Sequence, residues 1–276
     1  MKKDCHVHTT LSHDGVSDIE EYVYHAVEMG VDEITFTEHY DIYDDIDSNL
    51  KPVDVDEYFK RYKTLISRSN IVLNFGIEIG LQPDKGKEIK NLVNSYPFDY
   101  VIGSSHITCK KDMSKDPSYF EGLTRHEAYM NYFNEVYQNI ILFKDDFDVY
   151  GHLDYVVRYG GYEEKEINYE EFSDILDKIL IALIKNGKGL EINTSGYRYN
   201  LPNMHPNKDI LKRYKELGGK IVTIGSDAHN VKDLGKDFED AYRILKECGF
   251  EEYTVYHQRK PSFIEVPTLD KRRELC

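Results

Sequence analysis

Histidines and carboxylates recur in this sequence at spacings that bring two side chains to the same side of an extended strand. Residues two apart in a strand point the same way, and both His6/His8 and Asp227/His229 have this spacing. Single residues of the same kinds stand within or just after other short apolar runs, namely His39, Glu78, His106 and His152. Imidazole and carboxylate together suit Zn²⁺, Mn²⁺ or Fe²⁺. We therefore expect a transition-metal site.

Glu78 and the distribution of the histidines favour this interpretation over a purely structural one. Glu78 stands inside the apolar run 76–80, and a carboxylate there is unfavourable unless it is paired or bound to a metal. A single histidine near a strand end is more often a hydrogen-bonded core residue than a ligand. Here, however, six of the 11 histidines fall at the same end of successive expected strands, which favours ligands.

The candidate ligands are too many for one ion. They are His6, His8, Asp14, His39, Glu78, His106, His152, Asp227 and His229. Ions with four to six coordination positions would divide this set into two or three divalent sites. Closely spaced ions activate water and neutralise phosphate, so the set favours hydrolysis of phosphate esters. Amide and lactone hydrolysis stay open.

The elements that position these residues alternate between strand and helix. We expect strands at 4–8, 33–37, 71–79, 100–103, 148–151, 189–193 and 220–225, and a weak eighth at 253–256. Segments of helical periodicity separate them. Alternation of this kind predicts parallel strands with right-handed crossovers. The carboxyl ends of the strands then meet at one face, where α/β barrels hold their active sites.

The helix boundaries rest on capping signals. Ser17 and Glu20 have capping-box spacing before the apolar stripe Ile19, Tyr22, Val23, Ala26 and Val27, and Gly30 ends that pattern. Thr124 and Glu127 repeat the signal before a helix that reaches about Phe143, and Asn168 opens another that ends at Asn186-Gly187. The irregular acidic segments 41–58 and 110–124 are either active-site loops or plain surface loops. One domain, 1–276, is the simplest organisation.

Composition narrows the partners. The formal net charge is −15, and so acidic a surface repels nucleic acid and anionic membranes. No apolar stretch is long enough to span a membrane, and no apolar run follows the two N-terminal lysines, so we expect no signal peptide. Four scattered cysteines, Cys5, Cys109, Cys248 and Cys276, indicate reduced thiols in the cytoplasm. The oligomeric state stays open.

The ligand motifs resemble, in order, those of the polymerase-and-histidinol-phosphatase (PHP) superfamily. They are His6-x-His8, Asp14-Gly15, Glu38-His39, Glu78, Ser105-His106, Gly151-His152 and Ser226-Asp227-Ala228-His229. The resemblance implies a distorted (β/α)7 barrel with a trinuclear metal site. It implies one ion on His6, His8, Glu78 and Asp227, a second on Glu78, His106 and His152, and a third on Asp14, His39 and His229. His13 is an alternative to Asp14.

Within the superfamily the chain is most similar to stand-alone histidinol-phosphatases. The features are Gly151–Asp154 followed by Arg158, Leu190–Gly196 followed by Arg198, and Arg259-Lys260-Pro261. The resemblance implies hydrolysis of the small substrate L-histidinol phosphate in histidine biosynthesis. Another phosphoesterase of the superfamily, acting on a nucleotide or phosphodiester, and a non-catalytic metal-binding module are the alternatives.

Several residues have expected roles in this reaction. Arg158 and Arg198 each follow a strand end and can fork onto phosphate oxygens, although each can instead form a surface salt bridge. Asp14 or His229 would assist the leaving alkoxide. Glu191 and Asn193 would orient ligands or serve as structural hydrogen-bond partners. For the cationic end of the substrate we expect Asp41, Asp44, Asp45 and Asp47, with Tyr43 or Phe120 against the imidazole.

Overall fold

Seven parallel strands form a nearly closed barrel in the computed structural model, which describes residues 2–43, 46 and 50–268. In spatial order they are β1 (Lys2–Val7), β2 (Val31–Phe36), β4 (Val72–Gly80), β5 (Tyr100–Ser104), β8 (Val149–Tyr150), β9 (Gly189–Asn193) and β10 (Val222–Gly225). A two-residue strand, β3 (His39–Tyr40), pairs with the far half of β4. The predicted distorted (β/α)7 barrel is thus confirmed, with each predicted strand present.

The first and last barrel strands meet through residues of the candidate ligand pairs. The Asp227 N–H donates to the His6 carbonyl (2.8 Å), and the His8 N–H donates to the Ala228 carbonyl (2.9 Å). A parallel bridge joins Val7 to Ala228. The seam of the barrel therefore runs through the place where the two pairs of ligands lie.

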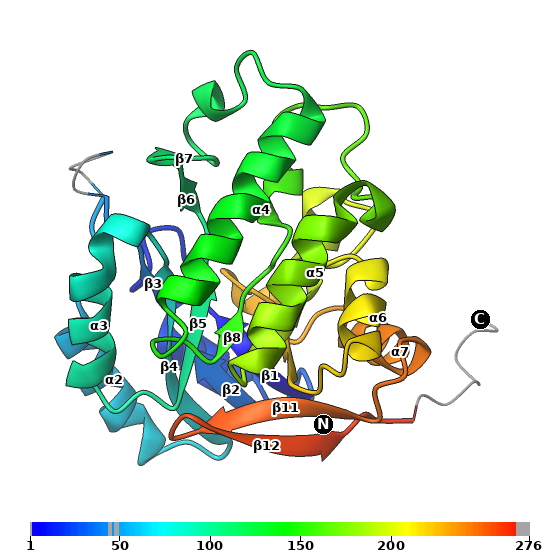
Figure 1. Cartoon of the computed structure of the whole chain (residues 1–276). Coiled ribbons are helices and arrows are strands. Elements are labelled where there is room, and N and C mark those ends of the chain that lie inside the picture. Colours follow the sequence, from blue (N-terminus) through cyan, green and yellow to red (C-terminus); the bar gives the residue numbers. More distant parts are fainter. Residues whose placement is uncertain (1, 44–45, 47–49, 269–276) are drawn as a thin grey trace.

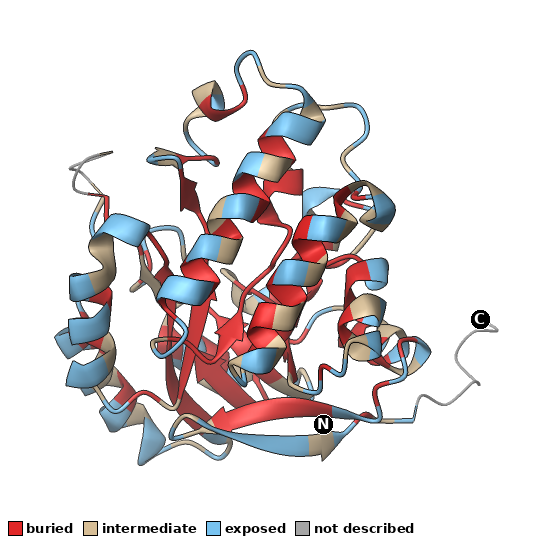
Figure 2. Cartoon of the chain, viewed as in Figure 1, coloured by how far each residue is buried: buried red, intermediate tan, exposed pale blue. Residues whose placement is uncertain are grey.

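The described residues form seven helices, of which α2 to α7 are labelled around the barrel in Figure 1. They are α1 (Ile19–His25), α2 (Val55–Ile66), α3 (Gly86–Ser95), α4 (Arg125–Leu142), α5 (Tyr169–Lys185), α6 (Lys208–Glu216) and α7 (Phe238–Glu247). Figure 2 shows the buried side of α4 and α5 toward the barrel and the exposed side toward solvent, as amphipathic periodicity requires. In the part of the chain that the structure describes, no helix combines the length and apolarity needed to cross a bilayer.

Two of the three predicted helix starts are confirmed. The Thr124 hydroxyl accepts from the Glu127 N–H (3.3 Å), and the Glu127 carboxylate accepts from the Thr124 N–H (2.9 Å), which starts α4. The Asn168 side chain accepts from the Glu170 N–H (3.1 Å) and starts α5. Both caps satisfy free N–H groups of a first turn.

The predicted start of the first helix is wrong by one residue. The cap is Asp18, whose N–H donates to the Glu21 carboxylate (2.8 Å). The Ser17 hydroxyl instead accepts from the Val231 N–H (3.1 Å), a partner supplied by the loop after β10. The helix also ends at His25, so Val27 is exposed and not part of the buried stripe.

A C-terminal hairpin covers the amino end of the barrel. The weak eighth strand is β11 (Glu252–His257), and it pairs antiparallel with β12 (Lys260–Glu265), which sequence analysis missed. The Arg259 N–H donates to the Asp99 carbonyl (2.9 Å), and Arg259 Nε donates to the Asp148 carboxylate. Asp99 and Asp148 directly precede β5 and β8, so the hairpin lies opposite the carboxyl ends (Figure 1).

Candidate metal centre

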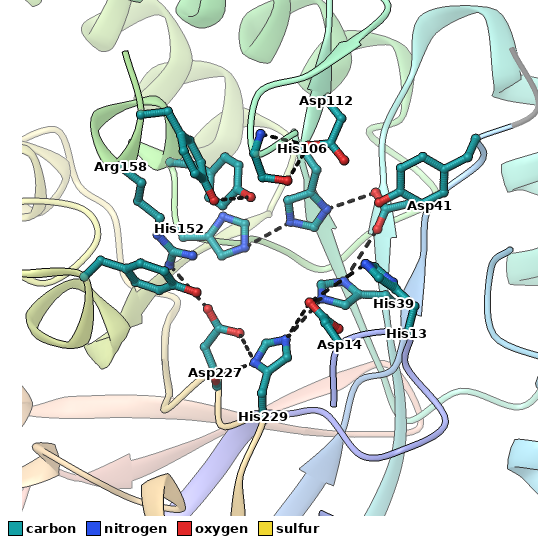
Figure 3. Close-up of a pocket in the computed structure, with 15 residues that line it drawn as sticks. His13, Asp14, His39, Asp41, His106, Asp112, His152, Arg158, Asp227 and His229 are labelled. Carbon is teal, nitrogen blue, oxygen red and sulfur yellow. Dashed lines mark hydrogen bonds and ion pairs between the residues drawn. The ribbon is translucent and has the colours of Figure 1, made fainter. Parts of the chain in front are cut away.

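The nine predicted ligands converge at the carboxyl ends of the strands, and most of them line one cavity (Figure 3). His6 and His8 are carried by β1 and the residue after it, and Asp227 and His229 follow β10 across the seam. Glu78 projects from within β4, where the apolar run that surrounds it is fully buried. Strand ends from across the chain thus deliver their side chains to one space, as in other parallel barrels.

The first group contains His6, His8, Glu78 and Asp227. The Nε2 atoms of His6 and His8 are 2.9 Å apart, and Glu78 Oε2 lies 3.3 and 3.4 Å from them. Asp227 Oδ1 lies 3.7 Å from His6 Nε2 and 3.5 Å from His8 Nε2. Ligand atoms around a tetrahedral ion with bonds of about 2.1 Å are roughly 3.4 Å apart. The four side chains therefore fit one ion.

The second group uses the other oxygen of Glu78. Oε1 lies 2.8 Å from His152 Nε2 and 3.3 Å from His106 Nε2, and these two nitrogens are 3.3 Å apart. These three distances between ligand atoms again fit the ligands of a single ion. Glu78 thus places one oxygen in each group, and its predicted role as a ligand shared by two ions stays a prediction.

The third group is the most exposed. Asp14 Oδ2 lies 3.3 Å from His229 Nε2 and 3.6 Å from His39 Nε2, and the two nitrogens are 3.4 Å apart. His13 lines the same cavity, but its Nε2 is 4.0 Å from the Asp14 carboxylate. The compact triangle favours Asp14 over His13 as the oxygen or nitrogen ligand of this group.

Unpaired buried atoms indicate that the groups are built around a cation. Glu78 Oε2 and His152 Nδ1 are buried and form no hydrogen bond of good geometry among the described residues, although Glu78 Oε2 lies 2.9 Å from His39 Nδ1. An ionised carboxylate oxygen buried without a hydrogen bond is strongly disfavoured. A divalent ion between Glu78, His6 and His8 would remove this penalty, so the residues present fit the ions that the sequence predicts.

Electrostatics favour ionised carboxylates in the site, whereas the imidazoles differ from one another. Burial tends to lower the pKa of His6, His39 and His106, but neighbouring carboxylates raise it above its ordinary value, to about 10 for His106. Burial tends to raise the pKa of Glu78, but the charge of His6, His106 and His39 lowers it well below its ordinary value. Burial also tends to raise the pKa of Asp227, which the same kind of interaction with His6 lowers. Burial, reinforced by nearby imidazoles, lowers the pKa of His8. Ionised carboxylates and a neutral imidazole are the forms that coordinate metals.

Two further carboxylates orient the ligands. Glu191 Oε1 lies 2.6 Å from His6 Nδ1, and its other oxygen accepts from the His152 N–H (2.9 Å). Asp41 Oδ1 lies 2.9 Å from His106 Nδ1. Each contact fixes Nδ1 as the protonated nitrogen and turns Nε2 toward the metal groups. The expected orienting role of Glu191 is matched by this contact, whereas sequence analysis had given Asp41 to the substrate amine.

Two residues near the site have structural contacts instead. Asn193 donates to Glu191 (3.1 Å), so it supports that carboxylate and touches no ligand. Glu38, the neighbour of His39, accepts from the hydroxyls of Thr9 (2.7 Å) and Ser12 (2.5 Å). Its hydrogen bonds hold the loop after β1 in place.

The two arginines differ in placement. Arg158 lines the cavity and donates to Ser195 Oγ (2.6 Å) and to Asp227 Oδ2 (3.3 Å). Arg198 donates to the carbonyls of Ser226 and Asp227, behind the ligand-bearing loop, and is not among the residues that line the cavity. A role for Arg198 in phosphate binding stays a prediction.

The cavity wall includes residues that the sequence did not single out. They are Asp112, Ser114, Tyr155, Tyr159 and Tyr199. Of the residues expected to read the substrate, Asp41 and Tyr43 line the cavity, Phe120 does not, and Asp44, Asp45 and Asp47 lie outside the described residues. Segments 41–58 and 110–124 both contribute wall residues, which favours active-site loops over plain surface loops.

Fold and site together define a barrel protein with a candidate multinuclear metal centre at its carboxyl face. The family described as "PHP domain" matches residues 4–195. The chain therefore belongs to the PHP family, as the motifs predicted.

Two relatives and one crystal structure align with nearly the whole chain. A "Probable histidinol-phosphatase" of Clostridium acetobutylicum is 34% identical, with 91% of this chain and 95% of the relative covered. A "Histidinol-phosphatase" of Lactococcus lactis subsp. lactis is 33% identical, with 94% and 96% covered. The crystal structure of histidinol phosphate phosphatase from Lactococcus lactis subsp. lactis, complexed with zinc, L-histidinol and phosphate, matches with a TM-score of 0.83 and 31% identity. That match covers 95% of this chain and 98% of the other.

Proposed function

We propose that the chain is a histidinol-phosphatase, which hydrolyses L-histidinol phosphate to L-histidinol and inorganic phosphate in histidine biosynthesis. The observation that carries the proposal is the set of three ligand groups, each of which has side chains that line one cavity, together with Arg158 in the wall of the same cavity. The relatives of that name align with more than nine-tenths of the chain. The reaction belongs in the cytoplasm, in keeping with the scattered cysteines, of which Cys5, Cys109 and Cys248 are free.

The proposed cofactors are two to three divalent transition ions, held by the three groups described above. Zinc is supported by the related crystal structure, and the ligand chemistry also suits manganese and iron. When bound, such ions neutralise the phosphate and provide a water nucleophile at neutral pH.

The residues of the chain bind the substrate and handle its protons. Arg158 contributes a guanidinium that fits phosphate oxygens. Asp14 and His229 are proposed to assist the leaving alcohol, because they are the most exposed ligands, with 44% and 25% of the side chain accessible.

The far wall of the cavity suits the cationic end of histidinol. The Asp112 side chain is almost fully buried, and Oδ1 accepts from the Ser114 N–H (2.8 Å) and hydroxyl (2.6 Å). Unlike Asp14, Asp41 and Asp227, it contacts no member of the ligand set among the described residues. Asp112 Oδ2 lies 3.6 Å from Nζ of the exposed Lys115. A substrate ammonium group would compete with Lys115 for this carboxylate.

A panel of phosphate monoesters, assayed with metal-replete enzyme, tests the proposal. We expect kcat/KM for histidinol phosphate to exceed that for a generic aryl phosphate by at least ~100-fold, since one charged contact contributes roughly 1.5–3 kcal/mol. Asp112→Asn should reduce that ratio, while Asp116→Asn, in the same segment but outside the cavity wall, should not. Equal kcat/KM for histidinol phosphate and unrelated monoesters would remove the named substrate.

A further inference from the structure

Arg158 has a buried histidine on its side away from the metal groups. Arg158 Nε donates to His205 Nε2 (3.0 Å), and His205 Nδ1 lies 2.5 Å from Asp154 Oδ1. The side chains of Arg158 and Asp154 are each 4% exposed, and that of His205 is 1% exposed. The three form a buried line that ends at the cavity wall, where Arg158 also contacts Asp227.

The contact between Arg158 and His205 determines where the imidazole proton lies. A guanidinium Nε always carries a hydrogen and can only donate. His205 Nε2 must therefore accept, so the ring is neutral and its proton is on Nδ1, where it donates to Asp154. The other tautomer, or the imidazolium, would set two N–H groups against each other at Nε2.

Asp154 and His205 are themselves held by the backbone. Asp154 Oδ2 accepts from the Asn207 N–H (3.1 Å). The His205 N–H and carbonyl are both bonded to Asn193, at the end of β9 (2.9 and 2.7 Å). The pair is therefore a rigid support, and neither side chain can follow Arg158 if the guanidinium moves.

The rest of the guanidinium is also fixed, apart from one nitrogen. Arg158 lies over the rings of Tyr199 (4.1 Å) and Tyr155 (4.9 Å). Nη2 is used by Ser195 and Asp227, and Nε by His205, whereas Nη1 has no hydrogen-bond partner among the described residues. Nη1 is thus the donor left for a ligand in the cavity that Arg158 lines.

We propose that Asp154 and His205 are positioning residues that hold the Arg158 guanidinium in place to bind the phosphate group of the substrate. The proposal rests on the proposed function only in that the ligand is a phosphate monoester. A long arginine side chain loses rotamer freedom when it binds, and a support that fixes it in advance removes that cost from phosphate binding. The carboxylate of Asp154 also offsets a buried positive charge close to the metal groups.

Asp154→Asn tests the proposal with little change in shape. The Asn207 N–H needs an oxygen, so the new amide turns its NH₂ toward His205 Nδ1 and forces the proton onto Nε2, against Arg158. We expect KM for histidinol phosphate and for p-nitrophenyl phosphate, and Ki for inorganic phosphate, each to rise ~10-fold, with kcat within ~3-fold. Metal content should stay at the wild-type level. The ¹⁵N spectrum of His205 should change from the Nδ1–H to the Nε2–H tautomer.

Arg158→Ala and the double variant show whether the pair acts through Arg158. If it does, Asp154→Asn adds nothing to Arg158→Ala, because interacting sites are not additive. His205→Gln keeps an acceptor and should retain most phosphate affinity, whereas His205→Leu should resemble Asp154→Asn. Glu166→Gln, a nearby surface carboxylate bonded to Asn203, is the matched control and should match wild type.

Different results would refute the positioning role and the proposed substrate. Additive losses in the double variant, or unchanged KM and Ki in both Asp154→Asn and His205→Leu, would overturn the positioning role. If Asp154→Asn does not fold, the comparison of His205→Gln with His205→Leu decides alone. A wild-type enzyme that binds inorganic phosphate but does not prefer histidinol phosphate would refute the proposed substrate and leave the phosphate-affinity test intact.

Discussion

The two ends of the barrel both bury charged groups, but they satisfy them differently. At the amino end the chain supplies every partner named here. Glu33 accepts from Lys3 Nζ (2.6 Å) and from Asn74 (2.9 Å), and Asp148 accepts from Arg259 of the hairpin. These contacts pair donors with acceptors, although Asp32 Oδ1, beside Glu33, is buried without a hydrogen bond among the described residues.

At the carboxyl end, nitrogen and oxygen atoms that can act as hydrogen-bond acceptors face one another. His6 donates from Nδ1 to Glu191, and His106 donates from Nδ1 to Asp41, so Nε2 is an acceptor in each ring when the ring is neutral, which is the form that binds a metal. Yet those Nε2 atoms lie 2.9 Å from His8 Nε2 and 3.3 Å from His152 Nε2. Carboxylate oxygens of Glu78 crowd the same space. The amino end therefore pairs charged groups with one another, whereas the carboxyl end gathers ligand atoms that a bound cation would pair.

Metal removal should show the largest difference between the two ends. We expect purified protein to carry about two to three equivalents of transition metal, and strong chelation to abolish activity and lower the thermal midpoint. The hairpin contacts should persist, so amide exchange at β11–β12 should change little while that around the carboxyl end increases. A metal-free preparation with full activity would contradict the assignment.

The second largest effect is expected from substitution of Glu78, the proposed bridging carboxylate. Glu78→Gln removes the charge that two groups share, and we expect kcat/KM to fall more than ~100-fold together with loss of bound metal, since even supporting residues account for ~10–100-fold. The matched control is Glu33→Gln, a buried carboxylate at the amino end, which should keep metal content and turnover but unfold at a lower temperature. Normal metal content and turnover in Glu78→Gln would mean that the bridge is misassigned.

A supporting carboxylate should have a smaller effect. Asp41→Asn weakens the hydrogen bond that orients His106, so affinity for the ion of the second group should fall ~10–100-fold, as measured by metal titration. Asp99, at the amino end, accepts from the backbone N–H groups of Phe75 and Gln258, so Asp99→Asn should leave metal affinity unchanged. Equal metal affinity in both variants would show that Asp41 does not support the ligand.

The smallest effect on catalysis is expected at the hairpin. Arg259→Ala leaves the nearly buried Asp148 without its cation, although the Val101 N–H still donates to it (2.9 Å). We expect a loss of about 1–3 kcal/mol of stability, or roughly 3–10 °C in the thermal midpoint. kcat/KM at 25 °C should stay unchanged. Reduced kcat/KM at an unaltered midpoint would instead connect the hairpin to the active site.

Strand ends and ligand groups were predictable because their signal is local. The i, i+2 spacing of His6/His8 and Asp227/His229 and the lone Glu78 in an apolar run are visible in a short window of sequence. Where the partner comes from far along the chain, sequence reasoning failed. The Ser17 hydroxyl does not cap the helix because it accepts from the Val231 N–H, 214 residues away. Asp41 contacts His106 because the fold brings the two together.

Residues in irregular segments were the hardest to assign. Asp112 lies in a two-residue strand, β7 (Lys111–Asp112), within a segment that has no periodic pattern, so nothing local points its carboxylate into the cavity. His205 is fixed by backbone bonds to Asn193, on a strand end that precedes it by 12 residues. The sequence predicts the strand ends that bear the candidate ligands. The residues that contact those ligands depend on tertiary structure.

The seam between β1 and β10 determines when, during synthesis of the chain, the candidate metal centre can form. The first group takes ligands from both ends of the sequence, since His6 and His8 are made at the start and Asp227 near the end. On a ribosome, which releases the N-terminal part first, this group stays incomplete until Asp227 has been synthesised, more than 200 residues after His8. If the proposed first group binds an ion, it does so only after β10 has been made.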